Sequence, residues 1–559
     1  MNKILLTAAA MAAVGTLCFA VDPSGTIPVL RINTENNAPI VSKEDYLNAT
    51  CYLETNGAEG IEPLGSAEAP VALTIKGRGN YTWTGFDKKP YKLKFDKKTE
   101  IMGMGKNKHF AILAHADDHL GFMRNITGFQ LSRLMGLAYT PADAPVEVVL
   151  NGDYIGLYFL TETIRIDSNR VNITEQEDNA TANVEGGWLV EIDNYDTDPH
   201  VSITEGNGER IIFTYKSPEV LSTEQEIYLK QQMEALNSAI YAKDKTDASA
   251  LEAILDLDAA ARFYIVQELM DDCESYHGSC YIYKDAGDGA KWEFGPVWDF
   301  GNSFQRGNKD KFIWQESTFN QTWIGELYKF PAFQEKVKEV WKDFCDNKLE
   351  SLFGYMKDYA EDMSQAADSD KERWPDYGNS NVVAKAESAI NFVKNSAKWL
   401  GKQWGYEPSF SQDPGEQVYV RGNFNNWSTS DPMVWKDSKW EMENISFTGD
   451  FKIASADWST IDFGGETEEI TPEAEKEYTL VATGRNLVMS SANSGKRMIF
   501  DPLTRKLFIT SGSGIEEISG IGENEPEEIF TITGQRVDKI GESGIYIIRS
   551  DGKSRKVIR

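Results

Sequence analysis

The sequence predicts an α+β domain over residues 25–405, followed by two smaller all-β domains. In the first 405 residues, segments with the two-residue alternation of strands are interspersed with segments whose apolar residues recur every three or four positions, as in amphipathic helices. Beyond a polar stretch at 406–416 that contains proline and glycine, only short strand-like segments follow. At 41% hydrophobic residues, the chain can form sizeable cores.

Charge and the N-terminus indicate an exported protein. The 57 basic and 87 acidic residues give a formal net charge of −30, which argues against binding to the backbone of nucleic acids. Residues 1–20 have the features of a secretory signal peptide: Lys3, then an apolar run that ends at Ala20. No other apolar run approaches the ~20 residues that a membrane helix needs. We therefore expect a secreted or cell-surface protein without a transmembrane segment.

Four cysteines remain after signal removal, namely Cys51, Cys273, Cys280 and Cys345. They allow three complete disulfide pairings, and the sequence does not choose between these pairings and free thiols.

The first basic motif follows a predicted strand at Val71–Lys76. The glycines on either side of Arg78 let the backbone bend and approach a ligand closely. The Arg78 guanidinium offers a fork of donors that suits phosphate. A hairpin turn with a surface arginine is the alternative interpretation.

A second basic motif, Lys88–Phe95, has the alternation of a strand. Tyr91, Leu93 and Phe95 would lie on an apolar face and Lys92 on the opposite face. This lysine face indicates either a phosphate contact or a solvated strand surface.

The elements that follow have local signals at their ends. Leu120–Leu134 is predicted to be a helix capped by Gly136. Pro145–Leu150 and Tyr154–Leu160 form a predicted hairpin, because Asn-Gly between them is the strongest short hairpin signal.

The second half of this domain is predicted to bring acidic groups together. A strand is expected at 187–193, and a helix with a capping box at 222–241. A helix from Asp256 or Asp258 then leads to Asp271–Glu274, which precedes a strand at Ser279–Tyr283.

A turn and a second strand then lead to Asp299, between Trp298 and Phe300. A strand–turn–strand unit brings its two ends together, as a metal and a catalytic base require. A carboxylate among aromatic rings needs a cation, and a metal on nucleotide phosphates is one such partner. A turn aspartate that caps a backbone amide is the alternative. Residues 331–404 are predicted to be largely helical.

Several motifs occur in the order found in one family: 77–83 (GRGNYTW), 88–94 (KKPYKLK), 123–125 (MRN), 151–158 (NGDYIGLY), 161–162 (TE) and 296–299 (PVWD). Over residues 25–405 the chain resembles the CotH family, the spore-coat-protein-H-like kinases. The resemblance implies an atypical protein-kinase-like fold that uses ATP with Mg²⁺ or Mn²⁺. It also implies transfer of the γ-phosphate to Ser or Thr of secreted acceptor proteins.

The resemblance also implies roles for individual residues. Asp299 matches the metal-binding aspartate, Lys89 or Lys92 the phosphate-neutralising lysine, and Arg78 and Asn80 a loop near the nucleotide, while Glu162 is a candidate partner for a lysine or metal. The helix predicted from Leu120 has no glutamate that could pair with the lysine.

The chain departs from the family at two positions. Where members have Asn-x-Asp, it has Asp272-Cys273-Glu274, so that Glu274 or Asp272 is the candidate catalytic base. Where members have Trp-Asp-x-Asp, the second acidic residue is Gly301. The alternative to an active kinase is therefore a catalytically inactive surface protein that serves as a binding or adhesion module.

Residues 417–510 are expected to form an immunoglobulin-like β-sandwich. Val418–Trp427 resembles the start of starch- and glycogen-binding modules, which implies a glycan partner. Trp427, Trp435, Trp440 and Trp458 are candidates for stacking on sugars, and core packing is the alternative for each.

Residues 511–528 are a predicted linker. The last segment, 529–559, resembles the C-terminal sorting domain of the type IX secretion system of Bacteroidetes. That resemblance implies delivery to the cell surface.

Overall fold

The computed structural model describes residues 21–510, except 194, 196, 197, 307, 308, 317–322, 409, 411–416, 437, 438, 459, 460, 467–469, 503 and 504, together with four strands between 528 and 558. The signal-peptide prediction and most of both predicted linkers lie outside the described residues. The chain divides into two compact units, Met1–Ser409 and Phe410–Arg559.

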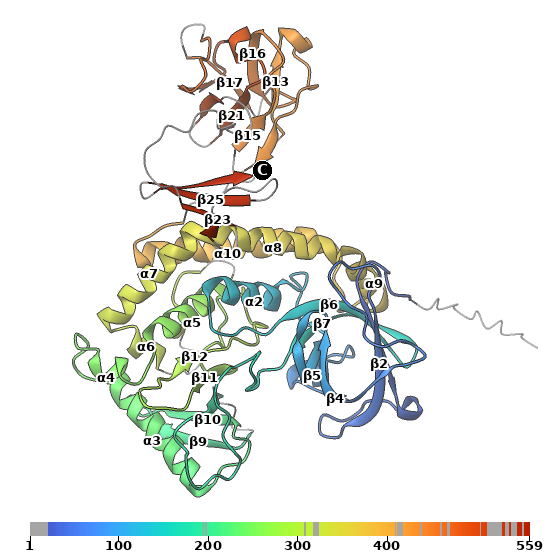
Figure 1. Ribbon diagram of the computed structural model, residues 1–559, viewed down its shortest axis with the longest axis vertical. Coiled ribbons are helices and arrows are strands. Elements are labelled where there is room, and N and C mark those ends of the chain that lie inside the picture. The colour runs from blue at the N-terminus through green and yellow to red at the C-terminus, as the bar shows by residue number, and fades with distance from the viewer. Residues whose placement is uncertain are drawn as a thin grey trace, which may run out of the picture. The chain divides into compact units, whose positions relative to one another are not determined.

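The first unit begins with a closed barrel of seven strands (Figure 1). Their order around the barrel is β1 (Val29–Thr34), β2 (Leu47–Glu54), β3 (Val71–Gly77), β4 (Tyr91–Ile101), β5 (Met104–Leu113), β7 (Asp153–Glu162) and β6 (Asp143–Leu150). A parallel β1–β6 pair closes it. Alternate apolar side chains such as Leu73, Leu93 and Phe110 fill its interior, so that Lys76 and Lys92, which are cross-strand neighbours, face outward.

Local sequence signals set several boundaries in this unit. Asn151 and Gly152 both have positive φ angles, 53° and 84°, as the predicted hairpin turn requires. Gly136 ends helix α2 (Met123–Met135) in the left-handed conformation. Gly77 is needed for a different reason: a Cβ there would lie 2.4 Å from the Trp83 indole, in helix α1 (Tyr81–Gly85).

The rest of the first unit contains a five-stranded sheet and a group of helices. The sheet has the order β12 (Glu293–Phe294), β11 (Cys280–Lys284), β8 (Trp188–Ile192), β10 (Arg210–Ser217) and β9 (His200–Thr204). The helices are α3 (Thr223–Ile240), α4 (Ser249–Glu252), α5 (Leu257–Met270), α6 (Ile324–Leu327), α7 (Pro331–Asn347), α8 (Leu349–Asp362), α9 (Ser364–Arg373) and α10 (Val382–Trp404). Figure 1 shows this part in green and yellow beside the blue barrel. The predicted mixture of helices and strands is confirmed.

The capping box predicted for α3 is present, and α5 starts at Asp256, one of the two predicted starts. Ser222 and Gln225 form the reciprocal capping box of α3, and the Asp256 carboxylate accepts a hydrogen bond from the Ala259 amide at the start of α5. Cys51, Cys273, Cys280 and Cys345 are free thiols. No helix within the described residues has the length and apolar character to cross a membrane.

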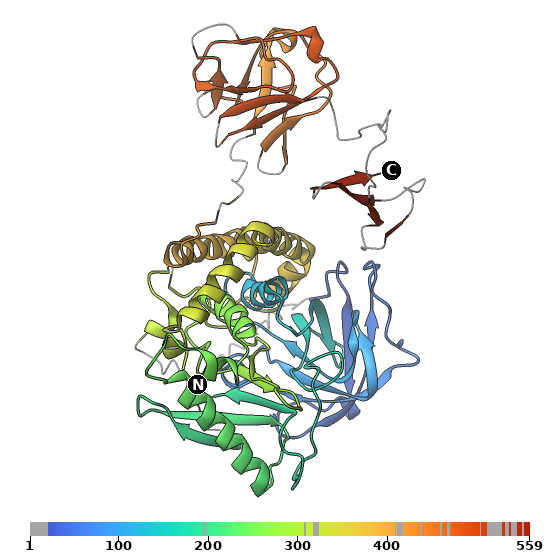
Figure 2. The same cartoon turned by 60° about the vertical axis from the view of Figure 1, so that its left-hand side comes forward.

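The second unit contains two five-stranded sheets around one apolar core (Figure 2). One sheet has β13 (Tyr419–Gly422), β16 (Gly449–Ala454), β17 (Asp462–Gly464) and β19 (Val481–Ala482), with β20 (Leu487–Met489) also on β16. The other has β14 (Val434–Lys436), β15 (Lys439–Met442), β21 (Arg497–Asp501), β22 (Lys506–Thr510) and β18 (Glu477–Thr479). The immunoglobulin-like assignment stays a prediction.

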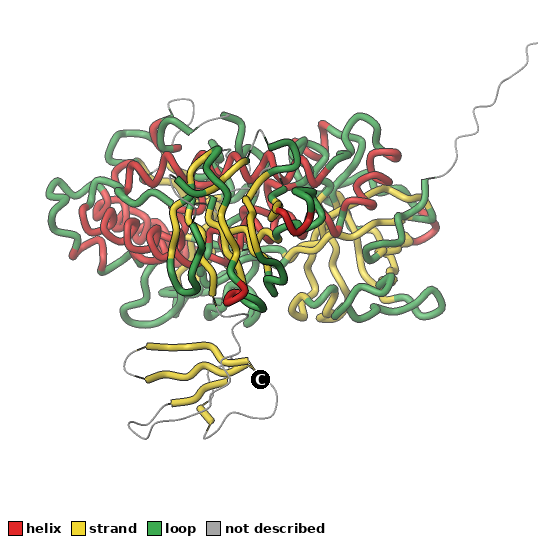
Figure 3. Tube along the Cα trace, turned by 90° about the horizontal axis from the view of Figure 1, so that it is seen from above, coloured by secondary structure: helices red, strands yellow, loops and turns green. Residues whose placement is uncertain are grey.

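A separate four-stranded antiparallel sheet follows near the C-terminus. Its order is β24 (Arg536–Val537), β23 (Glu528–Thr531), β25 (Ile545–Ser550) and β26 (Lys553–Ile558), and Figure 3 shows these strands side by side.

Candidate functional site

The loop that carries Asp299 is a turn rather than a strand. Asp299 has a positive φ of 60°, and its Oδ1 accepts a hydrogen bond from the Gly301 amide at 3.2 Å. The residue is exposed to solvent, whereas the neighbouring Phe300 is fully buried. The pKa of Asp299 is nevertheless raised, and the largest cause is burial of the carboxylate by the surrounding protein. Part of the residue therefore contacts solvent, while the carboxylate itself lies close to other protein groups.

The start of α2 holds this loop in place. The Asn125 side-chain oxygen accepts a hydrogen bond from the Phe300 amide at 2.9 Å, and Arg124 Nη1 donates to the Gly301 carbonyl at 2.7 Å. A Cβ on Gly128 would lie 2.2 Å from the Phe300 ring, so glycine is needed for this close contact. The position of Asp299 therefore depends on the Met-Arg-Asn motif.

Asp272 connects the turn after α5 to the same loop. Its Oδ1 accepts a hydrogen bond from the Glu274 amide at 2.9 Å, and its Oδ2 accepts from the Asn302 amide at 3.1 Å and the Ser303 hydroxyl at 3.3 Å. The residue is 1% exposed, and burial, with the negative charges of Asp299 and Glu274, raises its pKa to about 7. With both oxygens in use, this carboxyl positions its neighbours.

Glu274 is the more accessible of the two candidate bases. It is half-buried, and its Oε1 accepts a hydrogen bond from the exposed Tyr195 hydroxyl at 2.7 Å. Its charge raises the pKa of both Asp299 and Asp272, which places the three carboxylates in one electrostatic group. The β11–β12 hairpin thus brings its two acidic ends together, as the sequence predicts.

A buried charge network supports the turn before Glu274. Lys309, which is 5% exposed, lies 2.7 Å from Asp271 and 2.8 Å from Glu268, and Arg306 Nε donates to Asp271 at 3.0 Å. These contacts anchor the end of α5, because each buried charge has an opposite partner.

A cationic group beside the barrel contacts the carboxylates through one residue, Arg78. The guanidinium of Arg78 lies 5.7 Å from the centre of the Trp298 ring and interacts with the charge of Asp299. Burial, together with the positive charges of Arg165, Lys76 and Arg78, lowers the pKa of Lys92 to about 8. This concentration of positive charge is what an anion such as phosphate would neutralise.

The other candidate residues of the basic motifs have different partners. The Lys89 ammonium donates to the Trp83 carbonyl at 2.6 Å and lies 5.6 Å from the centre of the Trp83 ring. The Asn80 side-chain oxygen accepts from the Lys43 ammonium at 3.0 Å. Between the two lysines that the sequence left open, Lys92 is the one that lies with Arg78 in the cationic group.

Lys88 forms a buried ion pair that the sequence did not reveal. Its ammonium lies 2.7 Å from Asp370 in α9, and both side chains are at most 1% exposed. Asp370 also accepts a hydrogen bond from the Leu157 amide at 2.9 Å, and a Cβ on Gly156 would lie 2.2 Å from its carboxylate. The pair joins the barrel to α9. The sequence shows Lys88 as part of the basic motif but gives no sign of its partner.

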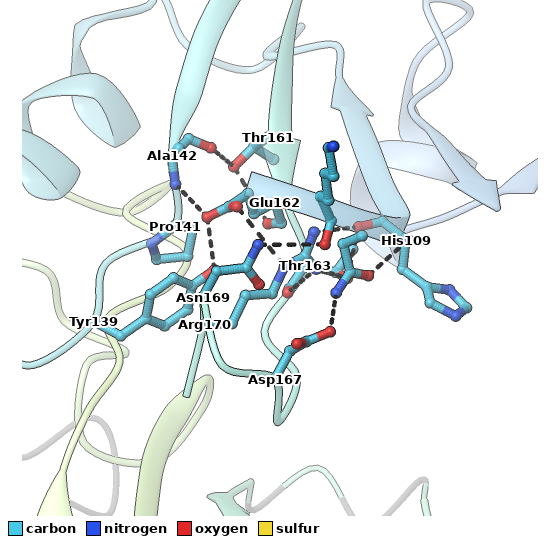
Figure 4. A network of polar contacts seen from close by, with 12 residues as sticks. His109, Tyr139, Pro141, Ala142, Thr161, Glu162, Thr163, Asp167, Asn169 and Arg170 are labelled. Carbon is cyan, nitrogen blue, oxygen red and sulfur yellow. Dashed lines mark hydrogen bonds and ion pairs between the residues drawn. The ribbon is translucent and has the colours of Figure 1, made fainter. Parts of the chain in front are cut away.

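Glu162 lies in the polar network of Figure 4, at the end of β7. Its Oε2 accepts hydrogen bonds from the Tyr139 hydroxyl at 3.0 Å and the Ala142 amide at 3.1 Å. Its Oε1 lies 3.8 Å from Arg170, which donates to the carbonyls of Thr163 and His109 at 2.7 and 2.8 Å. These partners are an arginine, a tyrosine and an amide, so the contacts of Glu162 are those of a structural residue that joins the end of β7 to the segments before β6 and after β7.

Asp117, in the loop between β5 and α2, is a further acidic residue at this place. A Cβ added to Gly301 would lie 3.2 Å from Asp299 Oδ1 and 3.7 Å from Asp117 Oδ2. Burial is the largest cause that raises the pKa of Asp117 to about 6, and the charges of Asp118 and Asp299 act in the same direction. Nothing in the local pattern of the sequence distinguishes Asp117 from Asp118.

The carboxylates provide two of the oxygen ligands that a hard divalent cation needs, but not a complete set. Among the described residues, no three Asp, Glu, His or Cys side chains gather as a metal site. Mg²⁺ commonly takes only one or two protein carboxylates and completes its shell with phosphate oxygens and water. Asp299 and Asp117 offer such a pair of oxygen donors.

The comparisons with known proteins agree with the arrangement of these motifs. The model of the CotH kinase protein family matches residues 75–400, which is more than half of the chain. No match to a curated protein was found. The match covers the barrel strands from β3 onward, the loop of Asp299 and the helices around it. The chain belongs to the CotH kinase protein family.

Proposed function

We propose that the first unit is a secreted protein kinase that transfers the γ-phosphate of ATP to Ser or Thr of extracellular or surface proteins. The observation that carries this proposal is the position of Arg78, which lies 5.7 Å from the centre of the Trp298 ring and interacts with the charge of Asp299. Lys92 lies on the cationic side of this contact, near Arg78, and Glu274 on the acidic side, near Asp299. Phosphoryl transfer depends mainly on positioning and on charge stabilisation, and these two groups supply both.

Each residue has a distinct part in the proposed reaction. Arg78, which interacts with Asp299, binds the phosphates, and Lys92 adds positive charge beside Arg78. Asp299 would hold Mg²⁺ or Mn²⁺, which would supply positive charge to neutralise the phosphates. Glu274 accepts the proton of the acceptor hydroxyl, and Asp272 keeps Glu274 in place through the backbone amide.

The direct test is incubation of the purified mature chain with γ-labelled ATP and Mg²⁺ or Mn²⁺, with casein as a generic acceptor. We expect label on the chain itself or on casein, and none after chelation with EDTA. ATP binding without transfer would instead favour the inactive binding module.

A second candidate function, glycan binding, is favoured by two tryptophans of the second unit. Trp427 and Trp458 are both half-exposed, and their ring centroids lie 5.9 Å apart. The Arg421 guanidinium lies 4.0 Å from the Trp458 ring and donates to the carbonyls of Trp427 and Ser455 at 2.7 and 2.8 Å. The arginine thus packs on the Trp458 ring and holds the backbone of Trp427, which supports a rigid sugar-stacking platform.

The other two tryptophans pack against the core. Trp440 is 2% exposed, and Trp435 lies against it with ring centroids 5.0 Å apart. We therefore assign the proposed glycan platform to Trp427 and Trp458 and give Trp435 and Trp440 a structural role.

Trp458→Ala is expected to weaken binding to glycogen or soluble starch by about tenfold, because stacking on an aromatic ring is worth on the order of 1 kcal/mol or slightly more. Affinity electrophoresis of the full mature chain measures this change. Tyr478→Ala, at a half-buried aromatic on the other sheet, is the matched control. Equal retardation of the wild type and Trp458→Ala would refute the platform.

We also propose that residues 529–559 direct the exported chain to the cell surface. The support is the resemblance to sorting domains and the separate four-stranded sheet formed by β23–β26. Removal of residues 525–559 is expected to abolish surface display while the kinase domain stays folded. Surface labelling and limited proteolysis measure the two effects, and undiminished display of the truncated chain would contradict the proposal.

A further inference from the structure

Gly301 leaves a gap in the acidic pattern of the proposed active site. The family's second acidic residue is absent at this position, so Asp299 alone would face the metal from this loop. The backbone of Gly301 nevertheless directs a Cβ toward two oxygens, Asp299 Oδ1 at 3.2 Å and Asp117 Oδ2 at 3.7 Å. A side chain at position 301 would thus begin in contact with a carboxylate from another element, Asp117.

The loop that carries Asp117 is fixed relative to Gly301. Asp118 accepts hydrogen bonds from the amides of Leu120 and Arg124, at 2.9 and 3.0 Å. Arg124 in turn donates to the Gly301 carbonyl at 2.7 Å. One residue at the start of α2 therefore ties both segments together, and preorganised ligands of this kind favour metal binding.

The chemistry of the two groups fits the same cation. Both are carboxylates, the hard oxygen donors that Mg²⁺ and Mn²⁺ prefer, and one or two such groups with phosphate oxygens form a usual site. The Arg124 guanidinium, which contacts the Asp299 loop, donates its hydrogen bond to the Gly301 carbonyl rather than to the carboxylate of Asp299.

We propose that Asp117 is the second protein ligand of the active-site metal and takes the place of the acidic residue missing at position 301. This inference rests on the proposed kinase function. It assigns the site one carboxylate from the Asp299 loop and one from the β5–α2 loop, so that the departure at Gly301 does not by itself inactivate the chain.

The test measures Mn²⁺ binding to the full mature chain with a non-hydrolysable ATP analogue, by electron paramagnetic resonance of free Mn²⁺. Asp117→Asn is expected to raise the Kd for Mn²⁺ by about tenfold to a hundredfold. Mutation of residues that only support a metal ligand already lowers metal affinity by this amount, so loss of a ligand should cost at least as much. Asp288→Asn, in an exposed turn, removes the same charge elsewhere and is expected to leave the Kd unchanged.

A double variant tests the replacement itself. Asp117→Ala combined with Gly301→Asp removes the side chain beside position 301, moves the carboxylate to the family position and is expected to recover most of the lost affinity. Thermal melting in EDTA verifies that each variant is folded. An unchanged Kd in Asp117→Asn, or no recovery in the double variant, would overturn the proposal.

The outcome for Asp117 is distinct from that for the kinase function. If Asp299→Ala abolishes Mn²⁺ binding while Asp117→Asn does not, the kinase proposal stands and the role of Asp117 is refuted. If the unmodified chain binds neither Mn²⁺ nor the nucleotide, both proposals fail.

Discussion

Asp299→Ala is expected to abolish metal-dependent ATP binding, with a loss of affinity of at least about a hundredfold, the upper range for perturbing a metal site. The carboxylate is the central acidic group of the site and interacts with the charges of Arg78 and Glu274. The fold should persist, because the loop is anchored through Asn125 and Arg124 rather than through Asp299.

Isothermal titration with a non-hydrolysable ATP analogue, with and without Mg²⁺, measures this prediction. The unfolding temperature of Asp299→Ala in EDTA should equal or exceed that of the wild type, since the variant removes one of several like charges at the site. Asp288→Ala serves as the control for loss of an exposed carboxylate. Unchanged, metal-dependent binding in Asp299→Ala would make this residue a structural turn aspartate.

The sequence predicts well those features that depend on neighbours along the chain. The Asn151-Gly152 turn and the Ser222 capping box are present because each is decided by a few adjacent backbone torsions and hydrogen bonds. The convergence of Asp272 and Asp299 is likewise local, since one hairpin, β11–β12, connects them.

Features that depend on segments distant along the chain cannot be predicted from the sequence alone. Lys88 meets Asp370 only because α9 packs on β7, and no spacing along the chain encodes that contact. Asp117 comes next to Gly301 through the start of α2, which contacts both loops. A single sequence does not contain these pairings in readable form, because they arise from tertiary packing.

The choice between Lys89 and Lys92 shows, within one motif, what the sequence predicts and what it does not. Strand alternation correctly places Lys92 on the outward face, opposite the buried Leu93. The partner of Lys89 depends on Trp83 folding back over Gly77, a contact that only the structure shows.

The electrostatic grouping of Glu274 with Asp299 leads to the second large effect. Glu274→Gln is expected to lower the turnover number by about a hundredfold to ten-thousandfold, the range for removal of a general base. ATP affinity should stay nearly unchanged, because the base contacts the acceptor rather than the phosphates. Glutamine keeps the shape of the side chain and can still accept the hydrogen bond from Tyr195.

Asp272→Asn distinguishes a base from a positioning residue. Both Asp272 oxygens accept hydrogen bonds from Glu274, Asn302 and Ser303, so an amide nitrogen there would meet a donor and cost about 1–3 kcal/mol of stability. We therefore expect Asp272→Asn to lower the unfolding temperature and to weaken ATP binding and turnover together. Asp288→Asn, the same change in an exposed turn, is the mild control. Steady-state kinetics measure both variants. If Asp272→Asn is fully stable and loses only turnover, while Glu274→Gln is nearly as active as wild type, Asp272 rather than Glu274 is the base.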